Sequence, residues 1–431
     1  MTEQAATSRL GTVSEATVVV AGGGPAGMML GLMLARAGID VVVLEKHSDF
    51  LRDFRGDTIH PSTLELIEEL QLTEKFAKIP YNPVRTTPAG SLEELNIKYP
   101  YVAMAPQWDF LDMLADEGRC YPHFHLLMDT EVTDTIREQR RIAGVRYRDR
   151  HGQERELRAA LTVAADGRHS TLRAASGLPA REYGVPVDVL WFRLSKSESD
   201  PQQGIALARV SPGRWIVGID RRTYWQVAYF VRKGGYAAVQ AAGIEAFRQS
   251  IRDTAPELVE QAGELKSFDN VSVLDVRVNR APRWHLPGLL LIGDAAHAMS
   301  PLGGVGINLA IQDAVATANI LYPALLRAQR TGTPVPEKLL HDVQRRRELP
   351  TRVIQSLQRA AQQRLIDPVL RGAEFKVPPL VGVLRRIPQL RRRALRTFAL
   401  GIRQEHVRTP RVETATEPVL GGQGAPRRNP A

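Results

Sequence analysis

The sequence predicts an α/β protein in which a mostly parallel sheet is interleaved with a separate antiparallel sheet and followed by C-terminal helices. Short β-branched or leucine-rich runs that stop at glycines, at 17–21, 161–167 and 286–293, are typical of buried parallel strands. Between residues 188 and 233 the pattern changes, because apolar and polar residues alternate between regularly spaced turns. That alternation predicts an antiparallel sheet in a second domain.

The first element is a β-α-β unit. The run TVVVA at 17–21 predicts a strand, PAGMMLGLMLARAG at 25–38 predicts a helix with a proline in its first turn, and DVVVLE at 40–45 predicts the next strand. A Gly-x-Gly-x-x-Gly turn joins the first strand to the helix, and an acidic residue ends the second strand.

Each part of this unit suits a dinucleotide. Gly22 makes the tight turn, Gly24 lets the backbone approach a pyrophosphate, and Gly27 allows close packing of helix and strand. The helix N-terminus offers free N–H groups to phosphates, and Glu45 would accept hydrogen bonds from ribose hydroxyls. The glycines alone are a weak signal, but strand, helix, second strand and acid together favour a dinucleotide site over an empty glycine-rich turn. The turn does not distinguish NAD from FAD.

The remaining elements follow from the same patterns. Ser62 and Glu65 fit a capping box at the start of a helix in 60–70. A hairpin turns around His151 and Gly152, and the proline-rich stretch 80–105 is expected to cross between domains. Further helices are expected at 107–118, 307–330 and 337–363.

The bulk composition excludes several classes of protein. Cys120 is the one cysteine among 431 residues, so neither a disulfide framework nor paired-thiol redox chemistry is available within a chain. No basic segment followed by an apolar core opens the chain, and no apolar run approaches the ~20 residues that span a bilayer. We expect a cytoplasmic protein. The pair His123 and His125 lacks further ligands in sequence, so we expect no metal site.

Three motifs in order give the chain a recognisable pattern: GGGPAG at 22–27, VAADGRHSTLR at 163–173 and GDAAHAMSPLGGVGINLA at 293–310. In this order and spacing they resemble the group A FAD-dependent monooxygenases, which include para-hydroxybenzoate hydroxylase and the ubiquinone-biosynthesis hydroxylases. The resemblance covers residues 15 to about 345 well and the remaining C-terminal part poorly. It implies a glutathione-reductase-type FAD-binding fold with an interleaved antiparallel-sheet substrate domain.

The resemblance also implies a domain order. We expect the following segments: a disordered N-terminus at 1–15, FAD-binding parts at 16–79, 106–180 and 281–345, a crossing at 80–105, a substrate domain at 181–280, basic helices at 346–411 and a disordered tail at 412–431.

Carried over residue by residue, the family's cofactor site falls on all three motifs and on isolated positions between them. The expected cofactor-binding residues are Gly22, Gly24, Pro25, Ala26, Gly27, Glu45, Lys46, Arg55, Gln107, Asp166, Gly167, Gly293, Asp294, Pro301, Gly304, Gly306, Ile307 and Asn308.

FAD is long, which explains why the chain has two glycine-rich stretches so far apart. The resemblance implies that Asp294 accepts a hydrogen bond from a ribityl hydroxyl. It also implies that the segment 301–308 lies along the flavin ring. The helix that begins near Ile307 would then point its N-terminus at the N1–C2 carbonyl edge, where reduced flavin carries negative charge.

For Asp166, Gly167 and Arg55, a structural role is an alternative to the role that the resemblance implies. The resemblance assigns Asp166 and Gly167 to the pyrophosphate region and to NADPH binding, whereas locally they form a turn in which Ser170 caps a short helix. Arg55 matches an arginine that pairs with the FAD phosphates, with a solvated surface charge as the alternative. Gln107 matches a glutamine near the ribityl chain.

The implied function is a single-component monooxygenase. NADPH or NADH would reduce FAD, O2 would form a C4a-hydroperoxyflavin, and an aromatic small molecule (phenolic, polyketide or quinone-like) would be hydroxylated. Because the cofactor carries this chemistry, no catalytic side chain is expected. His60 and His297 lie near flavin motifs but are expected to serve packing or hydrogen bonding. Trp191, Trp215, Trp225 and Tyr229 lie on strands expected to cover the substrate side, with half facing each way.

Two other functions stay open on the sequence. One is an FAD-dependent reductase or dehydrogenase of isoprenoid or other hydrophobic substrates without oxygen insertion. The other is a membrane-associated flavin-binding protein without hydroxylase activity.

The C-terminal segment carries most of the net charge of +10. From Arg371 to Arg411, eleven Lys and Arg face two acids, an excess of +9. A basic amphipathic helix can lie on the inner face of a membrane, which would suit a quinone-like substrate. A helix packed across the body with a solvated basic face is the favoured interpretation. Without a groove-reading motif, no nucleic-acid partner is expected.

Overall fold

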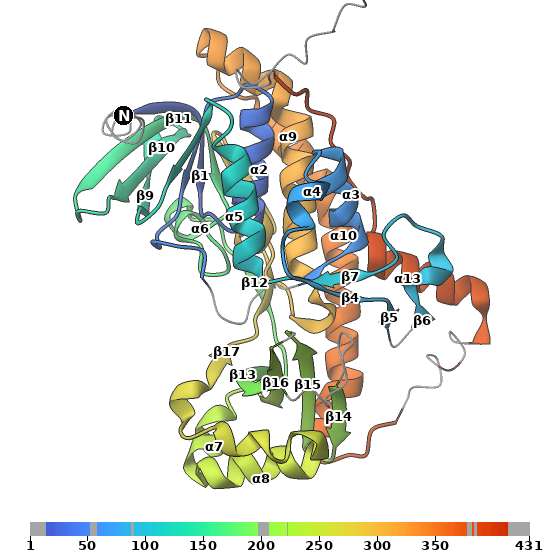
Figure 1. Ribbon diagram of the computed structural model, residues 1–431. Helices are drawn as coiled ribbons and strands as arrows, with labels where there is room; N and C mark the ends of the chain where they lie inside the picture. The colour runs from blue at the N-terminus through green and yellow to red at the C-terminus, as the bar shows by residue number, and fades with distance from the viewer. Residues whose placement is uncertain are drawn as a thin grey trace, which may run out of the picture.

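The structure is a computed structural model that describes residues 14–51, 58–87, 90–196, 207–221, 223–376, 382 and 386–412. The expected disorder at 1–15 and 412–431 and the candidate Arg55 therefore lie almost wholly outside the described residues. At the edge of the tail, the N–H of Val412 donates to the carbonyl of Arg36 at 2.9 Å. The described chain forms a large upper body and a smaller lower one (Figure 1).

Eight strands form the main sheet of the upper body, with the order β19-β20-β11-β1-β2-β8 and the hairpin strands β10 and β9 added beside β11. The core pairs β1–β2, β1–β11, β2–β8 and β11–β20 are parallel, as the sequence predicts. The strands are β1 (Glu15–Ala21), β2 (Val41–Leu44), β8 (Phe124–Leu127), β9 (Glu131–Glu138), β10 (Arg141–Arg148), β11 (Glu154–Ala164), β19 (His285–Leu286) and β20 (Leu289–Leu291).

Strand β11 joins two predicted elements. Residues 154–158 pair antiparallel with β10, which confirms the hairpin. The same strand continues to Ala164 in parallel register with β1 and β20, so the buried strand predicted at 161–167 is its second half. The long strand carries the chain from the exposed hairpin into the buried sheet.

Helices cover the main sheet, and both of its faces are buried. Val18 and Val20 pack with the helices, whereas Val19 and Ala21 pack toward the hairpin side. Two buried faces explain why these strands read as continuous apolar runs. The helices of this body are α2 (Pro25–Arg36), α3 (Pro61–Glu69), α4 (Thr73–Phe76), α5 (Gln107–Gly118), α6 (Thr171–Ser176), α9 (Gly306–Thr331) and α10 (Glu337–Ala361).

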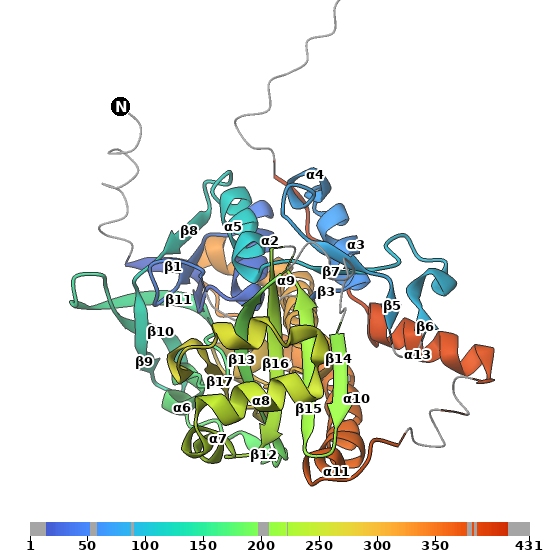
Figure 2. The ribbon, with the colours of Figure 1, turned by 60° about the horizontal axis from the view of Figure 1, so that its bottom comes forward.

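A five-stranded antiparallel sheet forms the lower body, in the order β14-β15-β16-β13-β17. Helices α7 and α8 cover its outer face, and the inner face turns toward the main body (Figure 2). The predicted alternation is thus confirmed. The elements are β13 (Val187–Ser195), β14 (Leu207–Ser211), β15 (Arg214–Asp220), β16 (Tyr224–Arg232), α7 (Tyr236–Ala242), α8 (Ile244–Thr254) and β17 (Ser272–Leu274).

Short strands link the two bodies, and several of them lie in the stretch that the sequence expects to cross between domains. The stretch 80–105 contains strands, and Asn82 donates its side-chain N–H to the carbonyl of Asp220 at 2.8 Å. The predicted capping box is wrong, because α3 begins at Pro61 with His60 as N-cap and no side-chain cap bond. The linking elements are β3 (Thr58–Ile59), β4 (Asn82–Val84), β5 (Thr86–Thr87), β6 (Gly90–Ser91), β7 (Val102–Met104), β12 (Arg181–Tyr183) and β18 (Val278–Arg280), with the short 3-10 helix η2 (Leu92–Leu95). The 3-10 helices η3 (Pro256–Leu258), η4 (Gln261–Glu264) and η5 (Phe268–Asn270) pack with the core of the lower body.

The C-terminal segment packs across the body. Helix α10 runs through the expected boundary between 345 and 346, and a π-helical turn at Gln362–Ile366 and α11 (Asp367–Leu370) follow it. Helix α13 (Pro388–Leu400) buries Leu395, Ala399 and Leu400 against the linking strands. These apolar side chains are not available to a membrane surface. The helical stretch Leu302–Thr331 is long and apolar enough to span one, but its most apolar window is 67% buried, as in a core helix.

Candidate active site

Two helix N-termini open onto one cavity. Helix α2 begins after Gly24 and helix α9 begins after Val305, and neither N-terminus has a side-chain cap. Between them lies Gly293, where a Cβ would stand 3.2 Å from the Cβ of Ala310 and 3.3 Å from that of Ala26. The two glycine-rich stretches, about 270 residues apart in sequence, are therefore packed together. Uncapped N–H groups give both ends a positive potential.

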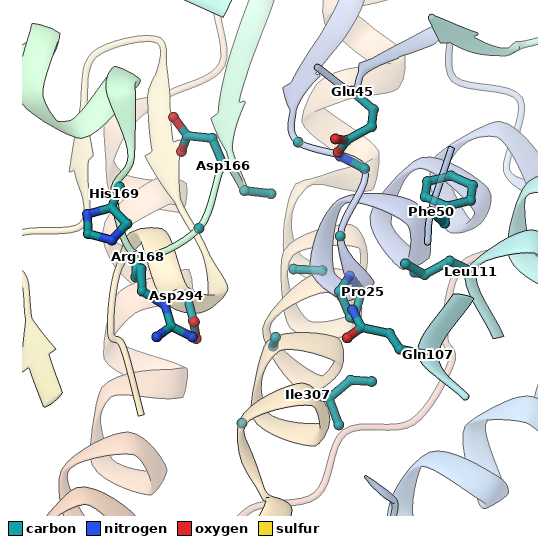
Figure 3. A pocket seen from close by; sticks show the side chains of 18 of the residues that line it. Pro25, Glu45, Phe50, Gln107, Leu111, Asp166, Arg168, His169, Asp294 and Ile307 are labelled. Atoms are coloured by element: carbon teal, nitrogen blue, oxygen red, sulfur yellow. The ribbon is translucent and has the colours of Figure 1, made fainter. Parts of the chain in front are cut away.

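The cavity has a volume of about 870 Å³. Pro25, Gln107 and Ile307 stand on one side of it, and Asp166 and Asp294 stand on the other (Figure 3). Of the expected cofactor residues, these line the cavity: Gly22, Gly24, Pro25, Ala26, Glu45, Lys46, Gln107, Asp166, Gly167, Asp294, Pro301, Gly304, Gly306 and Ile307. Gly27, Gly293 and Asn308 do not, and Arg55 is outside the described residues.

The first glycine turn requires its glycines. Gly22 has a φ of +102°, and a Cβ there would overlap the carbonyl of Ala165. A Cβ on Gly27 would overlap the carbonyl of Gly22, so this glycine serves packing beneath the cavity. A Cβ on Gly24 would meet nothing within 4 Å. The turn thus leaves open space directly before the α2 N-terminus, where a pyrophosphate would lie.

Glu45 lies at the end of β2, beside this turn. One carboxylate oxygen, Oε2, accepts the N–H of Gly23 at 2.9 Å, and the other, Oε1, accepts the N–H of His47 at 3.2 Å. The side chain is nearly buried yet lines the cavity. Glu45 therefore fixes the turn and places a carboxylate at the cavity wall.

At the second stretch, a buried ionic cluster supports the backbone of Gly293. The Oδ2 atom of Asp313 accepts the N–H of Gly293 at 3.1 Å and lies 2.6 Å from Nε2 of His297. Its Oδ1 accepts Nε of Arg347 at 3.0 Å, and Arg347 reaches Glu405 at 3.4 Å. Sequence reasoning did not find Asp313, Arg347 or Glu405, which are distant along the chain. His297 is interior, as expected.

The neighbours of Asp313 in this cluster stabilise its charged form. Burial alone would raise the pKa of Asp313, but His297 and Arg347 outweigh it and bring that pKa below its ordinary value. The carboxylate is therefore charged at neutral pH. A charged acceptor holds the N–H of Gly293 more firmly than a neutral one, and thereby holds the adjacent Asp294 at the cavity wall.

The loop before α9 approaches β3 closely. Gly304 has a φ of +61°, and a Cβ there would overlap the side chain of Thr58. The side chain of Asn308 supports this loop. Its Oδ1 accepts the N–H of His60 at 2.9 Å, and its Nδ2 donates to the carbonyl of Thr58 at 3.0 Å. Because its amide is used within the protein, Asn308 holds the loop in place from behind.

The structure confirms the local interpretation of the middle motif. Ser170 caps α6 by accepting the N–H of Arg173 at 3.0 Å. Asp166 accepts the N–H of Leu172 at 3.1 Å through Oδ2, while its buried Oδ1 has no partner among the described residues. Burial raises the pKa of Asp166 although Ser170 opposes the rise. An unsatisfied oxygen at the cavity wall is suited to a hydroxyl or N–H of a bound ligand.

The other end of the cavity reaches the lower sheet. Trp191, Ile219 and Gln226 line it from the inner face. The prediction that half of the aromatic residues face each way is confirmed, since Trp191 and Trp215 contact the inner core and Trp225 and Tyr229 the outer one. Ile219 and Gln226 were missed by sequence reasoning. The two-residue period of β15 could have placed Ile219 on the same face as Trp215.

Other candidates have structural roles. His60 is 1% exposed, and its Nδ1 lies 3.0 Å from the carbonyl of Phe398 on α13. Burial, opposed by contacts with Phe398 and Gly303, lowers the pKa of His60 to about 4. His123 pairs with Asp40 at 2.6 Å. No cluster of three or more potential metal ligands occurs in the part of the chain that the structure describes.

The residues present fit a flavin dinucleotide. The cavity offers an open pyrophosphate position, a carboxylate at each end, an orphaned Asp166 oxygen and a second helix N-terminus beyond the first. One β-α turn can hold only half of such a molecule, and the second stretch lines the rest of the same cavity. The fold and site define a flavoprotein with a separate sheet over the reacting end.

Comparison with known proteins identifies the family. Residues 15–356 match the model of the family described as "FAD binding domain", so the chain belongs to this family of group A flavoprotein monooxygenases. The expected α/β FAD-binding fold is confirmed. The chain is an FAD-dependent monooxygenase of the aromatic hydroxylase type.

Similar proteins agree with this assignment. The chain is 30% identical over 403 residues to 6-methylpretetramide 4-monooxygenase from Streptomyces rimosus, covering 91% of this chain and 94% of that protein. It is 25% identical over 333 residues to para-nitrophenol 4-monooxygenase from Pseudomonas sp. (strain WBC-3), covering 73% and 80%. The fold matches anhydrotetracycline hydroxylase from Streptomyces rimosus with a TM-score of 0.69 at 23% identity, covering 90% and 76%.

The family assignment decides between the functions left open. These relatives are named monooxygenases or hydroxylases, which favours oxygen insertion over the reductase and over the membrane-associated flavin protein. The buried face of α13 gives no ground for the membrane contact that the basic helix had suggested.

Proposed function

We propose that this enzyme hydroxylates an electron-rich, polycyclic aromatic substrate of the polyketide type, with NADPH or NADH as the reductant and O2 as the second substrate. The observation that carries the proposal is the shape of the cavity, which continues past the α9 N-terminus to the inner face of the lower sheet. The similarity to 6-methylpretetramide 4-monooxygenase over nearly its whole length supports a fused-ring substrate.

When bound, FAD supplies electron storage and activation of O2, and the chain supplies the surroundings. The cofactor-binding residues proposed here are those of the three motifs, with Glu45 and Lys46 at the adenosine end and Asp294 at the ribityl chain. The uncapped N–H groups of α9 stabilise negative charge at the reacting end. Glycines in the loop before α9 let backbone, rather than side chains, form that wall.

The lower sheet supplies positioning and water exclusion. Trp191 and Ile219 present apolar surface to the cavity, and Leu274 and Val276 extend that surface at the edge of the sheet. A dry wall suppresses side reactions with water and holds a flat ring in place. Met104 and Pro301 face this region from the main body. We assign no acid or base side chain to the reaction.

Oxidation of NADPH and NADH by the purified yellow protein tests the proposal. Rates are measured with and without phenols, naphthols and fused polyphenolic rings, and products are analysed by mass spectrometry under ¹⁸O₂. We expect an effective ring to accelerate flavin reduction and to gain one labelled oxygen atom. Flavin that is reduced at the same rate with every ring, and that yields peroxide without a labelled product, would contradict the proposal.

A further inference from the structure

Gln226 is a buried polar side chain in an apolar part of the cavity. It lies on β16, is 3% exposed, and lines the cavity beside Trp191 and Ile219. It pairs with Ile219 across the sheet, which places both side chains on the inner face. A lone carboxamide among apolar neighbours costs free energy unless something satisfies it, so its partners decide what it does.

The orientation of this carboxamide is determined by its partner. Nε of Arg221 donates to Oε1 of Gln226 at 2.7 Å. A guanidinium has donors and no acceptor, so the atom that it contacts must be the amide oxygen. The amide nitrogen of Gln226, which carries two N–H donors, is then the group that Arg221 does not engage. No described residue accepts from it.

We propose that the amide N–H of Gln226 donates a hydrogen bond to an acceptor oxygen of the aromatic substrate, either a phenolic oxygen or a ring carbonyl. This inference rests on the proposed function and narrows the substrate class to rings that carry such an oxygen at the sheet end of the cavity. Arg221 acts through Gln226 as a positioning residue, because it prevents the amide from presenting its oxygen instead.

The positive charge of Arg221 behind the amide of Gln226 strengthens the preference for an acceptor oxygen. A cation bound to the amide oxygen polarises the amide, so its N–H groups become better donors. In a cavity lined by Trp191 and Ile219, little water competes for that donor. Oxygens with high electron density, above all phenolates, are therefore favoured, and rings that present a donor at this position are disfavoured.

Equilibrium binding to the oxidised holoenzyme, without a nicotinamide cofactor, tests the proposal. The probes are 2-naphthol and naphthalene, which share the ring system and differ in one oxygen. Dissociation constants come from perturbation of the flavin absorbance. We expect the wild type to bind 2-naphthol at least tenfold more tightly than naphthalene, as for one buried hydrogen bond.

Two variants separate hydrogen bonding from packing. Gln226→Leu keeps the volume and removes the donor, so its affinity for 2-naphthol should fall about tenfold while that for naphthalene changes less than about twofold. Gln226→Glu replaces the donor by an acceptor and should weaken 2-naphthol further. Gln240→Leu, an exposed position on α7, is the matched control and should bind like the wild type.

A wild type that binds 2-naphthol no more tightly than naphthalene overturns the proposal, and so does an equal loss of both probes in Gln226→Leu. FAD content and naphthalene affinity report whether each variant is folded. Because binding is measured without turnover, absence of hydroxylation would refute the proposed function while leaving this preference measurable.

Discussion

Replacement of Asp313 by asparagine removes a charge that three donors share. In the wild type the carboxylate is 0% exposed and accepts from the N–H of Gly293, from His297 and from Arg347. Asparagine keeps the shape but has one acceptor oxygen. Arg347, itself 1% exposed, would keep Glu405 as its remaining carboxylate partner in the described chain.

The expected loss of stability in Asp313→Asn, and the resulting fall in melting temperature, follow from burial and chain length. Breaking a buried ion pair by neutralising one partner costs about 3–5 kcal/mol. For 431 residues the unfolding entropy is about 0.9 kcal/mol/K, so this cost lowers the melting temperature by about 3–6 °C. Loss of a charge-assisted bond to Gly293 should also weaken FAD binding by about tenfold or more, since Asp294 is the next residue.

Differential scanning calorimetry and FAD titration of the apoprotein measure the two effects. The matched control is Asp253→Asn, which removes an exposed carboxylate paired with Arg214 at 3.1 Å. Exposed pairs contribute about 0–1 kcal/mol, so the control should melt within about 1 °C of the wild type. If Asp313→Asn melts and binds FAD like Asp253→Asn, the buried cluster does not support the flavin site.

Three further predictions concern other parts of the molecule. Burial lowers the pKa of His60 to about 4 from 6.5, so the unfolded chain binds the proton first as the pH falls. The free energy of unfolding, measured with urea, should therefore fall by about 2 kcal/mol between pH 7 and pH 5. His60→Gln should make this free energy less dependent on pH. Gly304→Ala should lower FAD affinity at least tenfold because its Cβ overlaps a neighbouring side chain. Gly303 has a similar positive φ, but a Cβ there would meet no atom closer than 3.6 Å, so Gly303→Ala should lose less FAD affinity. Equal losses of affinity in the two variants would show that only backbone strain matters. Leu395→Ala on α13 should destabilise by about 2–5 kcal/mol and Leu390→Ala, 44% exposed, by far less, whereas equal melting temperatures would contradict the packed helix.

The part of the site that sequence predicted depends on local chemistry. The turn at 22–27 and the loop at 301–306 need glycines where the backbone approaches a ligand, so the glycines in the sequence indicate the local geometry. The buried parallel strands are readable for the same reason, because both faces must be apolar. The expectation that half of the aromatic residues of the antiparallel sheet face each way is also confirmed.

The remaining features depend on contacts between distant residues. Asp313 and Glu405 meet through Arg347, and nothing in their local sequence distinguishes them from solvated surface charges. The resemblance placed Asn308 at the cofactor, and nothing local showed that its side-chain amide is bound to the backbone of residues 58 and 60. Gln226 reads as an ordinary polar residue until Arg221 fixes its orientation.

The segment 403–412 has a consequence for biosynthesis. Residues 403–412 complete the ionic cluster through Glu405 and contact Arg36 at the end of α2 through Thr409 and Val412. A ribosome makes these residues after every strand of the main sheet. Until they emerge, Arg347 lacks one of its two carboxylates, so the mature flavin pocket is completed late. Nascent chains stalled before residue 403 should accordingly capture flavin poorly, and release of the full polypeptide should restore uptake.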